Sequence, residues 1–509
     1  MLHQNGNWRF GVWQRAGAAH ARGLAFLCVV SVLIAAPLWA QSRGPVLTKT
    51  YDNGGVYTGT FSMGRPDGQG SYRLPNGYEY EGDWVQGAIF GQGRARYPNG
   101  AVYEGSFIAG QPDGQGTMTF AEGDRYTGEW AEGQMTGKGE RLNADGSLYR
   151  GAFLGGLAQG QGVLEQPDGY VYVGEWVGGV RSGRAEITYP DGARYVGAVL
   201  DGARAGQGTL ALSNGQRFEG VWQADQISGP SRMVTAEGDV YDGMLVNGIR
   251  EGKGAMRYIG GPRYEGLFVA DKRSGLGTFY TAEGLIFTGT WKDDRIEGQG
   301  RITYPGGTTY EGELRDARPD GSGRMQFADG SIYQGNWRNG QMQGVGQLTY
   351  ADGAVYQGSF VADLPDGLGQ LRHPDGFAYD GEWQVGQKHG FGAAIYPDGS
   401  SYRGAFMQDK PEGPGVLRWA DGFVYSGEFR GGIRSGRGVA YYPTGDIYSG
   451  EFANDARQGR GWLIYSGGRA IDGLWQQGAL TGHVGPDGVV TQVDPAPANA
   501  TSAPIPSGQ

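Results

Sequence analysis

Aromatic residues and glycines recur along this chain at a fixed interval of 23 residues. The interval holds without a slip from Tyr57 to Ile471, and it defines nineteen units. Their first residues are Tyr57, Tyr80, Tyr103, Tyr126, Tyr149, Tyr172, Tyr195, Phe218, Tyr241, Tyr264, Phe287, Tyr310, Tyr333, Tyr356, Tyr379, Tyr402, Tyr425, Tyr448 and Ile471. A fixed period of this length is typical of repeat architectures. The pattern predicts a repeat array over residues 57–493, with a degenerate last unit.

The alternation of residue types within a unit predicts a β-hairpin. Tyr103, Gly105 and Phe107 occupy every second position, as they would on one face of a strand. Glu104 and Ser106 then face the other way. The first strand of each unit is therefore expected to carry an aromatic face and a polar face.

A second strand of the same unit is expected over residues 114–120, with Gly114 and Gly116 on a common face. Pro112–Asp113 and Glu122–Gly123 supply turn chemistry on either side of it. A glycine inside a strand costs about 0.5–1 kcal/mol relative to alanine. Because this cost recurs in every unit, we expect a neighbouring aromatic ring to cover each strand glycine.

These units predict an all-β protein built as one elongated, single-layer, twisted antiparallel sheet of tandem β-hairpins. A hairpin of this size cannot bury a core alone, so neighbouring units must share an aromatic face. Nineteen hairpins at the usual strand spacing would extend on the order of 180 Å. Residues 41–56 form a short lead-in, and residues 494–509 have the composition of a disordered tail.

The N-terminal segment differs from the array. Residues 1–23 form a basic region with three arginines and no acid, and residues 24–40 form an uncharged apolar run. This order is typical of a secretory signal peptide, and Ala40 suits a cleavage site although Leu38 does not. The run also reaches the lower length limit of a membrane-spanning helix.

Two alternatives follow from this segment. The chain is either cleaved near Ala40 and soluble in the periplasm, or anchored in the inner membrane by a hydrophobic helix over residues 24–40. The basic region favours a cytoplasmic N-terminus in both cases. Both alternatives predict export of the array to the cell envelope.

The composition of the chain argues against several classes of protein function. The chain has 100 glycines but also 13 tryptophans and 30 tyrosines, and disordered chains are poor in aromatic residues. A formal charge of −10 makes nucleic acid an unsuitable partner and predicts weak binding to anionic lipid. The single cysteine, Cys28, lies in the apolar run, which excludes disulfides and a cysteine-based zinc site in the array.

No constellation of residues predicts catalysis. The five histidines show no metal-ligand spacing, and His373 occupies a place seventeen residues after Tyr356 where other units carry an aromatic residue. Nucleophile-elbow and phosphate-loop signatures are absent from the sequence. We predict no catalytic, cofactor-binding or metal-binding residues and no cofactor, and hence no enzyme.

Acidic residues recur one and three positions after the start of many units, on the predicted polar face. We interpret them as a solvated face that keeps the sheet soluble, with an acidic surface for a basic partner or Ca²⁺ as the alternative. They are Glu81, Glu104, Glu219, Asp242, Glu265, Glu311 and Asp380 at the first place, and Asp83, Glu129, Glu175, Glu313, Glu382, Glu428 and Glu451 at the second.

The motif Tyr-x-Gly-x-Trp/Phe, then a turn and Gly-x-Gly, resembles the MORN (membrane occupation and recognition nexus) repeat. The unit from Phe218 departs from it, because Gly229–Pro230–Ser231 replaces Gly-x-Gly. The resemblance implies a scaffold, here of bacterial type, whose relatives bind proteins, dimerise, and in some cases have been proposed to hold phospholipids. In larger proteins such repeats accompany a separate catalytic domain.

The expected function is a non-enzymatic scaffold of the cell envelope that binds proteins of unknown identity or itself, with membrane association through residues 24–40. One alternative is a carbohydrate or cell-wall binder, since exposed aromatic rings stack on sugars. Another is an accessory unit of a lipid-modifying system, with phospholipid binding implied by the resemblance and weakened by the net charge.

Overall fold

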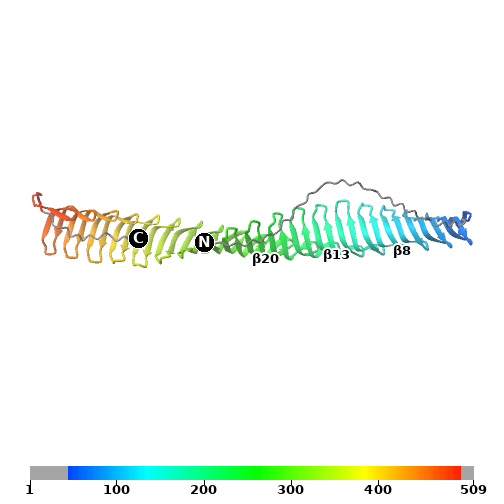
Figure 1. Ribbon diagram of the computed structural model, residues 1–509, viewed down its shortest axis with the longest axis horizontal. Coiled ribbons are helices and arrows are strands. Elements are labelled where there is room, and N and C mark those ends of the chain that lie inside the picture. Colours follow the sequence, from blue (N-terminus) through cyan, green and yellow to red (C-terminus); the bar gives the residue numbers. More distant parts are fainter. Residues whose placement is uncertain (1–43, 494–509) are drawn as a thin grey trace, which may run out of the picture.

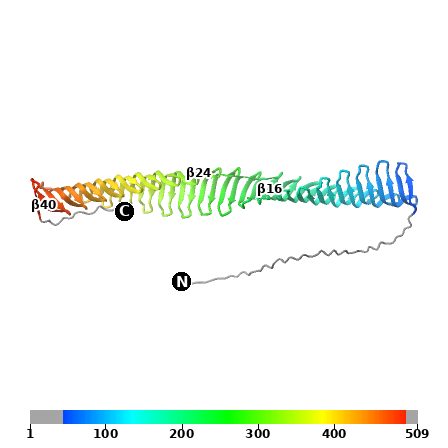
Figure 2. The same ribbon diagram turned by 90° about the horizontal axis from the view of Figure 1, so that it is seen from above.

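The computed structural model describes residues 44–493, which form one antiparallel sheet of 41 strands. Between the end strands β1 and β41, each strand pairs with its two neighbours along the chain, apart from the short β17, which pairs with β16 alone, so that β18 also pairs with β16. The result is a long, slender, twisted ribbon whose first and last strands lie at opposite ends (Figure 1). A quarter turn about the long axis shows the same single layer of strands (Figure 2). The predicted all-β, single-sheet architecture is confirmed for these residues.

Apart from the unit from Phe218 and the last unit, each unit contributes a first strand of 7 residues and a second strand of 9 residues. The first strands are β2 (Val56–Ser62), β4 (Glu79–Val85), β6 (Val102–Ile108), β8 (Arg125–Ala131), β10 (Leu148–Leu154), β12 (Val171–Val177), β14 (Arg194–Leu200), β16 (Arg217–Gln223), β19 (Val240–Val246), β21 (Arg263–Val269), β23 (Ile286–Lys292), β25 (Thr309–Arg315), β27 (Ile332–Arg338), β29 (Val355–Val361), β31 (Ala378–Gln384), β33 (Ser401–Met407), β35 (Val424–Arg430), β37 (Ile447–Ala453) and β39 (Ala470–Gln476).

The second strands are β3 (Arg65–Arg73), β5 (Ala88–Arg96), β7 (Gln111–Thr119), β9 (Gln134–Leu142), β11 (Leu157–Glu165), β13 (Val180–Thr188), β15 (Ala203–Ala211), the divided pair β17 (Gln226–Ile227) and β18 (Gly229–Val234), β20 (Ile249–Arg257), β22 (Lys272–Tyr280), β24 (Arg295–Thr303), β26 (Arg318–Gln326), β28 (Gln341–Thr349), β30 (Leu364–Arg372), β32 (Gln387–Ile395), β34 (Lys410–Arg418), β36 (Ile433–Tyr441), β38 (Ala456–Ile464) and β40 (Ala479–Val484). One extra strand lies at each end, β1 (Leu47–Thr50) and β41 (Val490–Gln492).

The turn inside the hairpin lies three residues earlier than the sequence predicts. In the unit from Tyr103, the turn residues are Ala109 and Gly110, with φ of 49° and 82°. Positive φ at both central residues is typical of the hairpin turn whose twist matches that of the strands. Pro112–Asp113 lie inside β7 instead of forming the turn, so that prediction was wrong.

A β-bulge explains how a proline fits inside the second strand. The register of β6 and β7 shifts between Gly105 and Phe107, and Pro112 lies opposite Phe107 just beyond the shift. A proline is tolerated at a bulge because the ladder is already interrupted there. The bulge also gives Gly114 a φ of 93° and turns it away from Gly116, so the predicted common face of these two glycines was wrong.

The turn between units is the one that the sequence predicts. Glu122–Gly123 lie in it, with a φ of 100° at Gly123. The Phe120 amide donates to the Asp124 carbonyl at 2.8 Å, and the Gly123 amide donates to the Phe120 carbonyl at 3.1 Å. The predicted turn at Glu122–Gly123 is therefore confirmed.

The core is a continuous layer of aromatic rings on one side of the sheet. The first tyrosine of a unit lies flat across two paired glycines, as Tyr103 does across Gly105 and Gly116. A Cβ on Gly116 would overlap the Tyr103 ring, and a Cβ on Gly105 would overlap the Tyr103 hydroxyl and the Gly116 backbone. The expected aromatic cover is therefore confirmed for these paired glycines, but not for Gly114, whose Cβ would meet Ser106. The hydroxyl of Tyr103 donates to the Ser106 carbonyl at 3.0 Å, which fixes the ring in this position.

Neighbouring units meet through edge-to-face ring pairs. Tyr103 contacts Phe107 of its own unit at 5.0 Å between centroids and Trp130 of the next unit at 5.2 Å. The indole Nε1 of Trp130 donates to the Gly116 carbonyl at 3.2 Å. Such pairs contribute about 0.5–1.5 kcal/mol beyond the burial of their area, so each unit depends on the next for its stability.

Three predictions fall outside the described residues: the basic region, the apolar helix over residues 24–40, and the tail over residues 494–509. Within residues 44–493, no helix is long and apolar enough to cross a membrane. Within the lead-in, residues 47–50 form β1 and extend the sheet by one strand beyond the first unit.

Candidate interaction surface

The aromatic side of the sheet is covered by its own rings. The first tyrosines of the units are almost fully buried, and the aromatic residues four positions later are nearly so. Expectations of an apolar binding patch or a sugar-stacking platform depended on exposed rings in these positions. Because neighbouring units bury these rings, the surfaces available to a ligand are the opposite side of the sheet and the turns.

Along one edge, the hairpin turns of successive units are tied together. The backbone amide of Gln86 donates to the Asp67 carboxylate at 3.1 Å, and the Glu132 amide donates to Asp113 at 3.2 Å. The acidic residue after Pro66 or Pro112 therefore caps the turn of the following unit. Asp113, which lies within a strand and not in the predicted turn, therefore connects two successive units.

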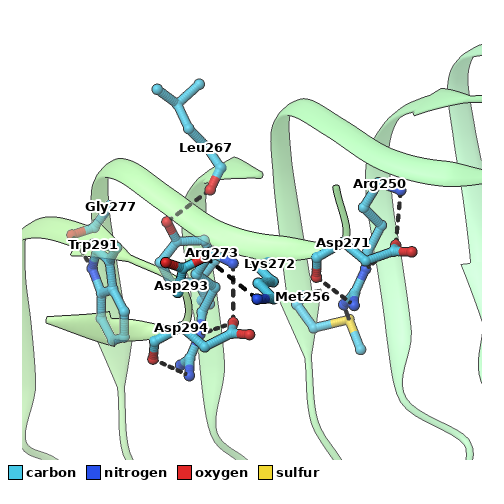
Figure 3. Close-up of polar contacts among 11 residues, drawn as sticks. Arg250, Met256, Leu267, Asp271, Lys272, Arg273, Gly277, Trp291, Asp293 and Asp294 are labelled. Atoms are coloured by element: carbon cyan, nitrogen blue, oxygen red, sulfur yellow. Dashed lines mark hydrogen bonds and ion pairs between the residues drawn. The ribbon is translucent and has the colours of Figure 1, made fainter. Parts of the chain in front are cut away.

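Other units use an arginine and an aspartate for the same connection, as Figure 3 shows. Arg273 Nε donates to Asp294 Oδ1 at 3.0 Å, and its Nη2 donates to the Asp294 carbonyl at 2.8 Å. The guanidinium also lies over the ring of Trp291, 4.4 Å from its centroid. Arg250 and Asp271 repeat the arrangement one unit earlier. These ion pairs belong to the assembly of the array, since their donors are engaged within it.

The outer face of the sheet, opposite the tyrosine rings, carries two rows of side chains along the whole array. One row combines positions one and fourteen of each unit, and the other combines positions three and twelve. Cross-strand pairing places these positions side by side, as with Arg94 and Glu104, or Gln92 and Ser106. The backbone of the paired glycines lies between the rows. It forms the floor of two shallow hollows, one lined by residues between Gln92 and Thr127 and the other by residues between Ser426 and Trp462.

The predicted acidic residues lie on this outer face, and half of them meet partners on the neighbouring strand. Glu104 accepts from Arg94 at 2.8 Å, Asp242 from Arg232 at 3.2 Å, and Asp380 from Gln370 at 2.9 Å. Exposed pairs of this kind contribute about 0.2–1 kcal/mol each. Their role is to keep the pairing specific and the face solvated.

Three of the acids at position three, Asp83, Glu313 and Glu382, accept a backbone amide at the bulge. Asp83 Oδ2 accepts from the Gln92 amide at 2.8 Å, and Glu382 Oε1 accepts from the Phe391 amide at 3.1 Å. Carboxylates therefore satisfy an amide that the bulge removes from the ladder. Among residues 44–493, no group of three or more His, Cys, Asp or Glu is placed to hold a metal ion.

His373 forms a charged contact that the sequence did not predict. Its Nδ1 lies 2.8 Å from Asp375 Oδ1, and its Nε2 lies 3.4 Å from Asp352 Oδ2. The hydrogen bond with Asp375 raises the pKa of His373 above its ordinary value, and it outweighs the opposing effect of desolvation. The side chain links two successive turns between units.

The outer face contains one feature that sequence reasoning missed. Position twelve is Gln in many units but Val345, Leu368, Phe391 and Pro414 in four successive ones, and all four side chains are exposed. Position fourteen continues the apolar character with Val416, Val439 and Trp462. Comparing the units of the sequence position by position would have revealed this feature, as a run of apolar residues at a position where most other units are polar.

Comparison with known families identifies the chain. It matches the MORN repeat over seventeen segments between residues 57 and 468, which together cover well over half of its length. The chain therefore belongs to the MORN repeat family. Its units at 218–240 and 471–493 are not among the matched segments. Members of this family are generally non-catalytic. A search of curated proteins finds no relative of this chain.

Solved structures show only distant likeness. The TCP domain of Drosophila melanogaster Sas-4 is 18% identical, with 34% of this chain and 86% of that one covered and a TM-score of 0.20. The TCP10 domain of Danio rerio CPAP is 14% identical, with 57% and 99% covered and a TM-score of 0.13. A virginiamycin B lyase from Staphylococcus aureus is 11% identical, with 64% and 97% covered and a TM-score of 0.11.

Proposed function

We propose that this MORN repeat protein is a non-enzymatic scaffold of the cell envelope that binds other proteins along the outer face of its sheet. The proposal rests on the difference in exposure between the two faces of the sheet. The aromatic face is buried by the array itself, whereas the outer face presents two rows of exposed side chains at a regular spacing. A rigid array with a variable outer row can hold several partners at fixed separations.

Export is the second part of the proposal, and it rests on the composition of residues 1–40. Either cleavage near Ala40 or a retained apolar helix over residues 24–40 would place the array outside the cytoplasm. The carbohydrate alternative loses its main support, because the rings in the repeated aromatic positions are buried. The lipid alternative conflicts with the net charge of −10.

The test combines fractionation of the native protein, sequencing of its mature N-terminus, and crosslinking from the outer face. Cysteines placed at Gln115 and at Gln299 would carry a photocrosslinker, and a cysteine at the buried position of Phe107 would serve as the matched control. Crosslinked proteins from the envelope fraction at the outer positions alone support the proposal. A chain that keeps residues 1–40 in the soluble cytoplasmic fraction overturns export, and equal crosslinking from all three positions overturns outer-face binding.

A further inference from the structure

The two hollows on the outer face share one architecture but differ in their polar side chains. In the first hollow, which spans β5 to β8, these side chains bond to one another. Arg94 donates to Glu104 at 2.8 Å, and Gln92 donates to Ser106 at 2.7 Å. A ligand in the first hollow would therefore have to break bonds that already exist.

The second hollow, which spans β35 to β38, contains a cation without a partner. Arg437 lies directly opposite Glu451 across β36 and β37, but the Glu451 carboxylate turns toward Gly459 at the bulge. Among residues 44–493, no hydrogen bond or ion pair engages the Arg437 guanidinium, whereas that of Arg460 is held by Asp472 at 2.7 Å. The second hollow therefore presents an unpaired positive charge.

An exposed tryptophan stands at the end of the second hollow. Trp462 is 49% exposed and is the only aromatic residue at position fourteen in the nineteen units. It lies outside the repeated aromatic positions, so the burial of those rings does not apply to it. Its cross-strand neighbour on the side of the hollow, Ser449, is small and leaves space beside the indole. The ring is thus available to a ligand that lies in the hollow.

Each group in the second hollow matches a part of an acidic sugar. The apolar face of an indole suits the flat C–H surface of a sugar ring. The hydroxyls of Ser426 and Ser449, which have no hydrogen-bond partner in the described part of the chain, can both donate and accept, as sugar hydroxyls do. An unpaired guanidinium binds a carboxylate through two parallel hydrogen bonds. The glycine floor adds no side chain that would obstruct the ring.

We propose that the second hollow binds a carboxylated sugar ring of an acidic polysaccharide, with the ring against Trp462 and its carboxylate on Arg437. These two residues lie two strands apart, or about 9.6 Å, which one sugar ring and the long arginine side chain can bridge. The inference goes beyond the proposed function, because the site is local to a few strands and needs no protein partner. It would attach one end of the scaffold to a polysaccharide.

Isothermal titration calorimetry of the full chain with oligogalacturonate, a short polymer of a carboxylated sugar, tests the site. Binding should weaken about tenfold or more when the carboxylates are methyl-esterified, because the charge-assisted hydrogen bonds to Arg437 are lost. Polyglutamate of similar length supplies carboxylates without sugar rings, and it should bind no better than the ester.

Variants locate the binding in the second hollow. Trp462→Thr and Arg437→Gln each introduce a residue that other units carry at the same position, as at Thr117 and Gln115, so the fold should be preserved. Each should weaken binding of oligogalacturonate about tenfold or more. Arg184→Gln is the matched control, because Arg184 is an exposed arginine at position twelve of a unit outside the hollow. This variant should bind as the natural chain does.

Failure of oligogalacturonate to bind overturns the proposal, as does equal binding of the ester. Equal binding of polyglutamate would assign the hollow to acidic peptides and also overturns it. Equal weakening by Arg184→Gln would show a general attraction to negative charge and no site at Trp462. Crosslinking of envelope proteins from Gln115 and Gln299 is measured separately, so any of these failures would leave the scaffold proposal standing.

Discussion

Units that begin with tyrosine differ in their core from the two that begin with phenylalanine. In a tyrosine unit such as 103–125, the ring is fully buried over its glycine pair and its hydroxyl donates to a backbone carbonyl. In the units from Phe218 and Phe287, the first ring is only half-buried. Aliphatic side chains occupy the space over the glycines instead, with Ile227 near Gly220 and Leu314 near Gly300.

This comparison shows that the tyrosine hydroxyl, as well as the ring, holds the aromatic layer in place. Each tyrosine that begins a unit donates to the carbonyl three residues later, at 2.7–3.1 Å. Phenylalanine lacks this bond, and its ring moves off the glycines. The unit from Phe218 goes further, because Ser231 replaces the second glycine and the second strand divides into β17 and β18.

Alkaline titration should produce the largest effect, since it acts on every tyrosine unit at once. Burial raises the pKa of Tyr57, Tyr126 and Tyr149 to about 12. Their contribution to stability is complete below the unfolded pKa of about 10 and is lost as pH rises through the folded value, by about 1.4 kcal/mol per pH unit for each tyrosine.

Circular dichroism and tyrosinate absorbance, followed together, check this prediction. We expect the sheet signal and the absorbance of most tyrosines to change in one transition well above pH 10. A complete tyrosinate titration near pH 10 with the sheet preserved would contradict the proposed role of the buried hydroxyls.

Gly116→Ala should have the next largest effect. The added methyl would overlap the ring of Tyr103, and overpacking of this kind costs about 1–3 kcal/mol. Gly300→Ala is the matched control in the unit from Phe287, because its methyl would meet the flexible end of Leu314 at 2.6 Å. Hydrogen exchange of the affected strands should show greater loss of protection at Gly116 than at Gly300, and the reverse order would sink the comparison.

Much of this fold could be predicted from the period and the alternation alone. Tyr103, Gly105 and Phe107 reveal the aromatic face, and Glu122–Gly123 reveal the turn between units. The hairpin turn could not be read in the same way, because Ala109 adopts a positive φ that its residue type does not favour. Pro112 indicated a turn and instead marks a bulge, whose existence depends on the pairing of two strands.

The binding surface was harder to predict than the fold. Aromatic residues drew attention to the face that the array buries, since sequence alone cannot tell a ring that covers a neighbour from one that awaits a ligand. Phe391 and Trp462 stand out once the other rings are accounted for. Their significance depends on comparing equivalent positions between units as well as residue types within one unit.

Tyr103→Phe should reproduce part of the phenylalanine arrangement inside a tyrosine unit. The change removes the hydrogen bond to the Ser106 carbonyl, which costs about 0.5–1.5 kcal/mol. Tyr441→Phe is the control, since this exposed tyrosine lies outside the core. Hydrogen exchange should show faster local opening of β6 and β7 in the first variant alone. Equal protection in both variants would mean that ring packing suffices without the hydroxyl.

The smallest effect is expected at His373, which replaces the aromatic residue that other units carry at this place. Its pKa is raised, chiefly by the hydrogen bond with Asp375, so its contribution to stability is complete below the unfolded pKa of about 6.5. That contribution is lost as pH rises through the folded value. His373→Phe should remove this pH dependence and restore the aromatic arrangement of neighbouring units. Hydrogen exchange of the β30–β31 turn, corrected for intrinsic rates, should therefore show protection falling as pH rises above about 6.5 in the natural chain alone. Identical profiles for the two chains would show that His373 acts as a packing residue, and that the tyrosine layer, rather than charge at the turns, sets the local stability of this unit.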